Sequence, residues 1–108
     1  MNPRIQQLIS RFKEYGLDAL LITSDVNIRY LTDFPSSESW LLICPKRAFY
    51  ITDPRYDLEA RQGLKAIGVK VYHSSLAQTL WELASLTGAK RIGFDDRHGG
   101  GIVLRPLA

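Results

Sequence analysis

The segment Ala19–Ile22 limits the fold more than any other part of the sequence, because all four of its side chains are apolar. A strand that is covered on one face alternates apolar and polar residues, whereas a strand covered on both faces reads as a continuous apolar run. The preceding stretch carries an apolar stripe at helical spacing, made by Ile5, Leu8, Ile9 and Phe12. The sequence therefore predicts a sheet with helices packed against it.

The remaining elements follow from periodicity and from cap residues. Helices are expected at 3–15, at 25–31 after the cap residue Ser24, from Pro54 to near Gly68, and between the cap residue Ser75 and Gly88. Further strands are expected at 40–44, 48–52, 69–72 and 91–94. The order is α-β-α-β-β-α-β-α-β, and the tight connection after residue 44 predicts an antiparallel hairpin. We expect an α/β fold with a mixed sheet of about five strands and helices on both faces.

Charge and composition favour one globular domain without nucleic acid or membrane as partners. The chain has 108 residues and a net charge of +3, and its basic residues occur singly or in pairs such as Lys46-Arg47. Nucleic-acid binders concentrate positive charge on one face, so only the pI of 9.2 keeps that alternative open. The N-terminus has no apolar signal-peptide core, which predicts a cytoplasmic protein. The one cysteine, Cys44, lies in an apolar run and is expected to be a buried hydrophobe.

The acids and histidines do not suggest a catalytic centre inside the chain. Eleven acidic residues and two histidines are scattered, and their only dense cluster is Asp95-Asp96-Arg97-His98. Neighbouring acids after a strand point in opposite directions, so we expect solvated loop charges there rather than a metal site. His73 is expected to have a surface or structural role. Neither a phosphate-binding glycine loop nor a nucleophile with a base is present, so no catalytic residue is assigned.

One feature could bind a ligand. In Thr52–Tyr56, Asp53 caps a helix whose first turn presents Arg55 and Tyr56 directly after a strand. Ligands bind at the carboxyl ends of strands in such sheets, and the planar guanidinium matches a carboxylate. The alternative is an exposed arginine that pairs with Asp57 or Glu59, and both interpretations stay open.

Four segments together resemble the N-terminal domain of the creatinase, prolidase and Xaa-Pro aminopeptidase family. Gly16–Ser24 resembles the family's G-L-D-A-L-L-V-T-S, and Asn27–Thr32 resembles the start of its N-I-x-Y-L-T-G-F. Thr52–Tyr56 matches T-D-x-R-Y, and Lys90–Asp95 matches K-x-I-G-F-[DE]. The four segments occur in the family's order and spacing, and together they cover roughly residues 4 to 96.

The resemblance implies a function that this chain performs only in part. Whole enzymes of the family add a C-terminal pita-bread domain, which holds two divalent metals, usually manganese or cobalt, on Asp, Asp, His, Glu and Glu. The N-terminal domain makes oligomer contacts and helps to close a neighbouring subunit's active site. By resemblance Arg55 and Tyr56 face the intersubunit region, with Arg55 as the candidate for an acidic group of substrate or partner. Trp40 is a candidate wall of the neighbour's pocket, with a sheet-face position as the alternative.

The sequence departs from the family at two places. Asp33 stands where the family has glycine, and aspartate tolerates the left-handed conformation better than most residues. After residue 96 the family resemblance ends, so we expect a domain at 1–96 and an unassigned tail or truncation point at 97–108.

The leading hypothesis is therefore a non-catalytic N-terminal domain of a Xaa-Pro aminopeptidase or dipeptidase, inactive alone. Its expected partners are its own catalytic domain, a second subunit and, in the full-length enzyme, Xaa-Pro peptides. A stand-alone α/β binding or dimerisation module remains the alternative.

Overall fold

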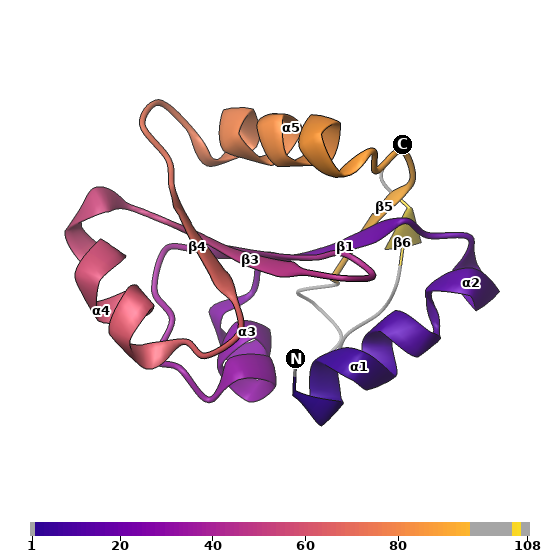
Figure 1. Cartoon of the computed structure of the whole chain (residues 1–108), viewed down its shortest axis with the longest axis horizontal. Helices are drawn as coiled ribbons and strands as arrows, with labels where there is room; N and C mark the ends of the chain where they lie inside the picture. The colour runs from indigo at the N-terminus through magenta and orange to yellow at the C-terminus, as the bar shows by residue number, and fades with distance from the viewer. Residues whose placement is uncertain (1, 96–104, 107–108) are drawn as a thin grey trace.

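The computed structural model describes residues 2–95 and 105–106, which form one mixed sheet with helices on both faces (Figure 1). The strands are β1 (Ala19–Ile22), β2 (Trp40–Ile43), β3 (Ala48–Thr52), β4 (Gly68–Val71), β5 (Ile92–Phe94) and the two-residue β6 (Arg105–Pro106). The helices are α1 (Pro3–Ser10), α2 (Phe12–Tyr15), α3 (Asp25–Thr32), the 3-10 turn η1 (Pro54–Tyr56), α4 (Asp57–Gly63) and α5 (Leu76–Thr87). The predicted α/β class is confirmed.

The strand directions bring the carboxyl ends of four strands to the same end of the sheet, here called an edge. The spatial order is β4-β3-β2-β1-β5-β6. β2 is antiparallel to both β1 and β3, while β5 is parallel to β1 and β4 is parallel to β3. Strands β1, β3, β4 and β5 therefore point the same way, and their carboxyl ends share an edge with the start of β2. We call this edge the carboxyl edge.

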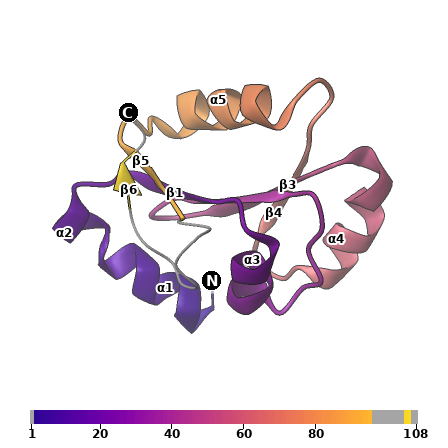
Figure 2. The ribbon, with the colours of Figure 1, turned by 180° about the vertical axis from the view of Figure 1, so that it is seen from behind.

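Two apolar cores lie on opposite sides of the sheet. Helices α1 to α4 cover one face, and α5 covers the other (Figures 1 and 2). Alternate residues of β1 enter different cores: Leu20 and Ile22 pack on the side of α1 and α3, and Ala19 and Leu21 pack on the side of α5. All four residues of β1 are buried, which confirms the prediction of a strand covered on both faces.

The predicted caps form where the sequence places them. The Ser24 hydroxyl accepts a hydrogen bond from the Asn27 backbone N–H, and the Ser75 hydroxyl accepts one from the Gln78 N–H at 3.0 Å. Asp33 ends α3 with φ of 56°, so the aspartate adopts the left-handed conformation that its place in the sequence suggested.

Two helix boundaries differ from the prediction. The first helix is divided at Arg11, which caps α1 and precedes α2. The helix expected to reach Gly68 ends at Gly63, and Gly68 begins β4 instead. The reason is tertiary packing, because Leu64 leaves the helix in an extended conformation and is buried in the core beneath α1 and α3.

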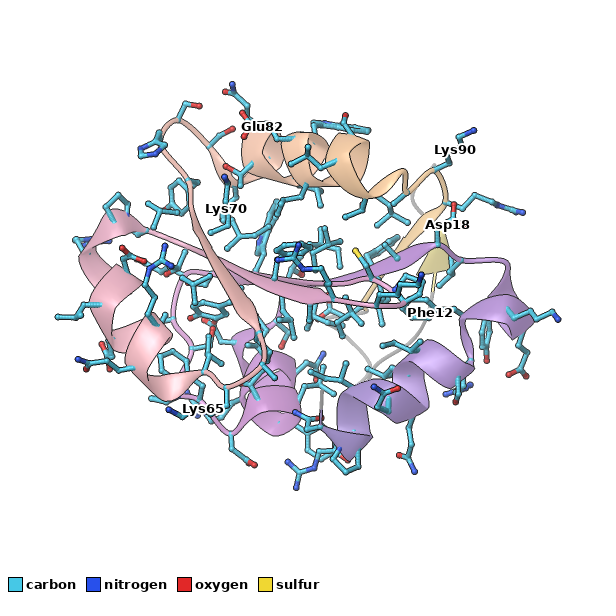
Figure 3. The ribbon with its side chains drawn as sticks, viewed as in Figure 1. Phe12, Asp18, Lys65, Lys70, Glu82 and Lys90 are labelled. Atoms are coloured by element: carbon cyan, nitrogen blue, oxygen red, sulfur yellow. The ribbon has the colours of Figure 1, made fainter. Side chains whose placement is uncertain are left out.

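Asp18 joins the segment before β1 to the segment before β5. Its Oδ2 accepts hydrogen bonds from the backbone N–H groups of Lys90 at 3.0 Å and Arg91 at 3.1 Å. Figure 3 shows Asp18 and Lys90 at the same end of the molecule. These two hydrogen bonds lower the pKa of the exposed Asp18 carboxyl.

The expected domain boundary at residue 96 lies outside the described residues and stays a prediction. Residues 97–104 and 107–108 of the predicted tail lie outside the described residues, whereas β6 pairs antiparallel with β5. Within the described part of the chain, no helix is long and apolar enough to cross a membrane.

Candidate functional site

Polar side chains collect at the carboxyl edge in two groups. Thr23, Ser24 and Asp95 follow β1 and β5, while Asp53 and Tyr72 follow β3 and β4. The two groups contain similar residue types but differ in their exposure to solvent. That difference separates a structural cluster from a site that is open to a ligand.

The first group is a buried carboxylate cluster around Asp95, which is only 2% exposed. Its Oδ1 accepts from the Thr23 backbone N–H at 2.8 Å and from the Thr23 hydroxyl at 3.0 Å. Its Oδ2 accepts from the Ser24 backbone N–H and from the Asn27 side-chain amide, both at 3.0 Å. The prediction that Asp95 is a solvated loop charge is therefore wrong.

Hydrogen bonding decides the charge state of Asp95. Burial alone would raise its pKa, because a buried carboxylate loses hydration. The hydrogen bonds from Thr23, Asn27 and Ser24 stabilise the charged form and lower the pKa below its ordinary value. Asp95 is thus an ionised group whose lone pairs hold the start of α3 against the end of β5. Its donors already occupy both oxygens, so this group has a structural role.

The second group surrounds Arg55, in the turn η1 that follows β3. One Asp53 oxygen, Oδ1, accepts from the Arg55 backbone N–H at 2.8 Å and from Arg55 Nε at 3.0 Å. The Tyr72 hydroxyl donates to the other oxygen, Oδ2, at 3.3 Å. The hydrogen bonds from Arg55 hold the pKa of Asp53 below its usual range. Burial, followed by the negative charge of Asp53, raises the pKa of Tyr72.

The guanidinium of Arg55 points away from the core and has a second acidic neighbour. Its Nη2 lies 3.3 Å from Oε2 of Glu38, and the Arg55 side chain is 66% exposed. Its Cζ lies 5.2 Å from the centroid of the Tyr56 ring. The acids that contact Arg55 are thus Asp53 and Glu38 rather than Asp57 or Glu59, because Asp57 pairs with Arg61.

Sequence reasoning missed Glu38, although the hairpin register contains a signal for it. Trp40 is paired with Ile51 across β2 and β3. Extending this pairing by two residues, before Trp40 and after Ile51, places Glu38 beside Asp53. The intervening pair confirms this continuation, because the Ser39 hydroxyl donates to the Thr52 hydroxyl at 2.8 Å.

Tyr56 and Trp40 lie on different surfaces. Tyr56 is half-buried at an open pocket of about 170 Å³, which is lined by Phe34, Pro35, Ser37, Tyr50, Tyr56 and Glu59. Trp40 is half-buried and packs against the core beneath α5. The fold therefore brings Arg55 and Tyr56 together, while Trp40 occupies the sheet-face position that the sequence left as an alternative.

The other chemistry-bearing residues form no centre within residues 2–95. In that range, no group of three or more His, Cys, Asp or Glu side chains is arranged to hold a metal ion. His73 is exposed, and His98 lies outside the described residues. Cys44 is a buried free thiol, as predicted, and burial raises its pKa.

Comparisons with known proteins agree with this geometry. Residues 4–103 match the profile of the family described as the creatinase/prolidase N-terminal domain. The uncharacterized peptidase YqhT of Bacillus subtilis strain 168 is 35% identical over 92 residues, which are 85% of this chain and 26% of the relative.

Solved structures give the same result. The Xaa-Pro dipeptidase from Bacillus anthracis superposes with a TM-score of 0.81 at 28% identity, over 85% of this chain and 26% of that chain. The N-terminal domain of the cytoplasmic peptidase PepQ from Mycobacterium tuberculosis H37Rv superposes with a TM-score of 0.78 at 30% identity, over 88% of this chain and 74% of that one. The present chain thus spans about a quarter or less of the length of the curated relatives it matches, 26% in the case of YqhT.

Proposed function

Because this chain belongs to the creatinase/prolidase N-terminal domain family, we propose that it acts as the non-catalytic domain of a cytoplasmic Xaa-Pro aminopeptidase or dipeptidase. Its work in that enzyme is to make contacts between subunits and to supply Arg55 and Tyr56 to a neighbouring subunit's substrate pocket. The catalytic domain and a second subunit are its partners, and Xaa-Pro peptides are the substrates of the whole enzyme.

The observation that carries this proposal is the exposed guanidinium of Arg55. Asp53 orients it through Nε, yet two thirds of the side chain remains open to solvent, with 66% exposed. A guanidinium held at one edge retains N–H donors that can bind a carboxylate with two parallel hydrogen bonds. Such an arginine suits an acidic group that arrives from outside the domain, either on a substrate or on a partner subunit.

Exposed apolar side chains support the oligomer contacts. On α5, Trp81 is 68% exposed and Leu86 is 80% exposed. Contiguous apolar surface is typical of faces that another chain or domain covers, and these two side chains are candidates for such a face. We propose that α5 contributes to such a contact and that Trp40, which is half-buried on the α5 side of the sheet, is a candidate wall of the neighbour's pocket.

The two divalent metals of the family do not fit the described residues of this chain, because those residues contain no suitable group of ligands. We therefore assign manganese or cobalt to the separate catalytic domain. No step of the chemistry is assigned to the side chains described here.

The test has two arms. The purified chain should hydrolyse no Xaa-Pro dipeptide or tripeptide with or without Mn²⁺. In a chimera, this chain would replace the N-terminal domain of the Bacillus anthracis Xaa-Pro dipeptidase, and Arg55→Ala would then be compared with Arg61→Ala. A charge-assisted hydrogen bond contributes about 1.5–3 kcal/mol, so kcat/KM should fall roughly 10- to 100-fold for Arg55→Ala.

Arg61 is the matched control because it is also an exposed arginine, and it pairs within α4. Its replacement should leave kcat/KM within about twofold of the unsubstituted chimera. Metal-dependent turnover by the purified chain would contradict the non-catalytic assignment. Equal effects of the two substitutions in the chimera would contradict the role of Arg55.

A further inference from the structure

The two carboxylates that contact Arg55 have different structural origins. Asp53 is two residues away and is part of the turn that creates the site. Glu38 comes from the loop before β2, seventeen residues away in sequence. A contact built into the turn and a contact supplied by a distant loop need not serve the same purpose.

Asp53 is fixed by several bonds. Its Oδ1 binds the Arg55 backbone N–H as well as Nε, so moving the carboxylate would also uncap the turn. Its Oδ2 is held by the Tyr72 hydroxyl from β4's end. Asp53 therefore orients the guanidinium through its Nε–H, as part of the same turn.

Glu38 is held far less firmly. One contact of 3.3 Å joins it to Arg55 Nη2, and the two side chains are 68% and 66% exposed. Exposed ion pairs of this kind shift an equilibrium by about fivefold at most. The Glu38 backbone has φ of 49°, a conformation that glutamate rarely adopts, while the Ser39 side chain is anchored to Thr52. The carboxylate can thus swing away without disturbing β2.

The free donors of Arg55 show what Glu38 blocks. The described contacts engage Nε and Nη2, and none of them engages Nη1. A carboxylate that approaches the guanidinium end-on binds Nη1 and Nη2 together. Glu38 occupies one of those two nitrogens with a single oxygen, which is a poorer version of the same interaction.

We propose that Glu38 is an intramolecular placeholder: its carboxylate covers Arg55 in the free domain and is displaced by the carboxylate of an incoming ligand. This inference rests on the proposed function of Arg55 and adds a competitor to it. The placeholder keeps the exposed guanidinium paired until a better-fitting carboxylate arrives, and it lowers the affinity of the site by the strength of its own contact.

The experiment follows the Arg55 Nε–H signal by NMR in the ¹⁵N-labelled chain while glycyl-proline is added, with glycyl-prolinamide as the probe that lacks a carboxylate. Glu38→Gln removes the competing charge and keeps the side chain's length. It should tighten glycyl-proline binding about two- to fivefold relative to the natural sequence. The amide probe should move the signal in neither protein.

Glu59→Gln is the matched control, because it removes the same charge from an exposed residue next to Tyr56 without touching Arg55. It should change the affinity by less than about twofold, since only long-range charge is altered. A second arm raises the protein concentration without peptide. A shift of the Arg55 and Glu38 signals there supports displacement by a carboxylate of a second copy.

The outcomes separate the two proposals. If Glu38→Gln binds no more tightly than Glu59→Gln, while glycyl-proline moves the Arg55 signal and glycyl-prolinamide does not, the placeholder is overturned and Arg55 remains a carboxylate-binding residue. If neither peptide nor protein concentration moves the Arg55 signal even in Glu38→Gln, both proposals are overturned.

Discussion

Replacing Asp95 by asparagine tests the most consequential interaction that the sequence did not reveal. Each oxygen of this 2%-exposed carboxylate accepts two hydrogen bonds, from Thr23 at Oδ1 and from Ser24 and Asn27 at Oδ2. Asparagine has one oxygen and one NH₂ group. With the NH₂ group at the Oδ2 position, the Ser24 N–H and the Asn27 amide would face another donor. With the NH₂ group at the Oδ1 position, the Thr23 hydroxyl can rotate to accept from it, and only the Thr23 backbone N–H would lose this acceptor.

The expected loss follows from the better of these two orientations. One unsatisfied donor costs about 1–3 kcal/mol, and replacing a charged acceptor by a neutral one in the remaining bonds of these half-buried groups adds about 1 kcal/mol. Asp95→Asn should therefore lower the free energy of unfolding by about 2–4 kcal/mol. The total free energy of unfolding of a typical domain is about 5–15 kcal/mol. With an m-value of about 1.5 kcal/mol/M, the urea midpoint followed by circular dichroism should fall by about 1–3 M.

Asp18→Asn is the matched control, because both of its backbone donors, Lys90 and Arg91, bind the same oxygen, Oδ2. The amide oxygen of asparagine can keep both bonds at this exposed position, so the loss should stay below about 1 kcal/mol. Equal losses for the two substitutions, or a loss below about 0.5 kcal/mol for Asp95→Asn, would refute the account of the buried cluster.

The lowered pKa of Asp95 predicts that the stability of the fold depends on pH. The pKa of Asp95 is lower in the folded chain than its ordinary value of 3.8, so its ionised form stabilises the fold above about pH 4. That stability is lost as the pH falls through the folded pKa. Urea midpoints measured between pH 5 and about pH 2 should therefore fall less steeply for Asp95→Asn than for the natural sequence. A parallel pair of curves would contradict the assignment.

Two further predictions use buried positions. Burial raises the pKa of Cys44, so its reaction with a disulfide reagent at pH 8 should be at least about tenfold slower in the folded chain than in urea; fast labelling of the folded chain would contradict this. A Cβ at Gly63 would lie 2.5 Å from the Phe34 ring, so Gly63→Ala should lower the free energy of unfolding by about 1–3 kcal/mol. Gly88 has φ of 74° and open space around it, so Gly88→Ala should lower that free energy by about 1 kcal/mol. The reverse order in urea unfolding would count against the packing.

The sequence predicted the features that depend on neighbours in the chain. The continuous apolar run Ala19–Ile22 predicts a strand between two layers, and Ser24 and Ser75 predict helix starts by their own hydroxyls. The left-handed turn at Asp33 also follows from one residue's preference. Each of these features depends on only a few neighbouring residues, so hydrophobic pattern and residue preference are sufficient to predict it.

The missed features depend on partners far along the chain. Asp95 is hydrogen-bonded to Thr23 across 72 residues, so its burial does not follow from its neighbours in sequence, although the family motif K-x-I-G-F-[DE] ends at this residue. The helix after Arg55 ends at Gly63 because Leu64 packs into the core, and helix propensity alone does not predict this end. Glu38 required the hairpin register before its place beside Asp53 became visible.

Exposure, rather than residue type, separates the two acidic groups of the carboxyl edge. Asp95 and Asp53 both follow strands, and both have pKa values lowered by hydrogen bonds. Asp95 accepts four hydrogen bonds from groups inside the domain. Asp53 accepts two from Arg55, whose side chain is exposed to solvent. The sequence identified Asp53 as a cap residue but not Asp95 as a buried one. Only the folded chain shows that Asp95 is buried among its donors, whereas Asp53 orients an arginine that is exposed to solvent.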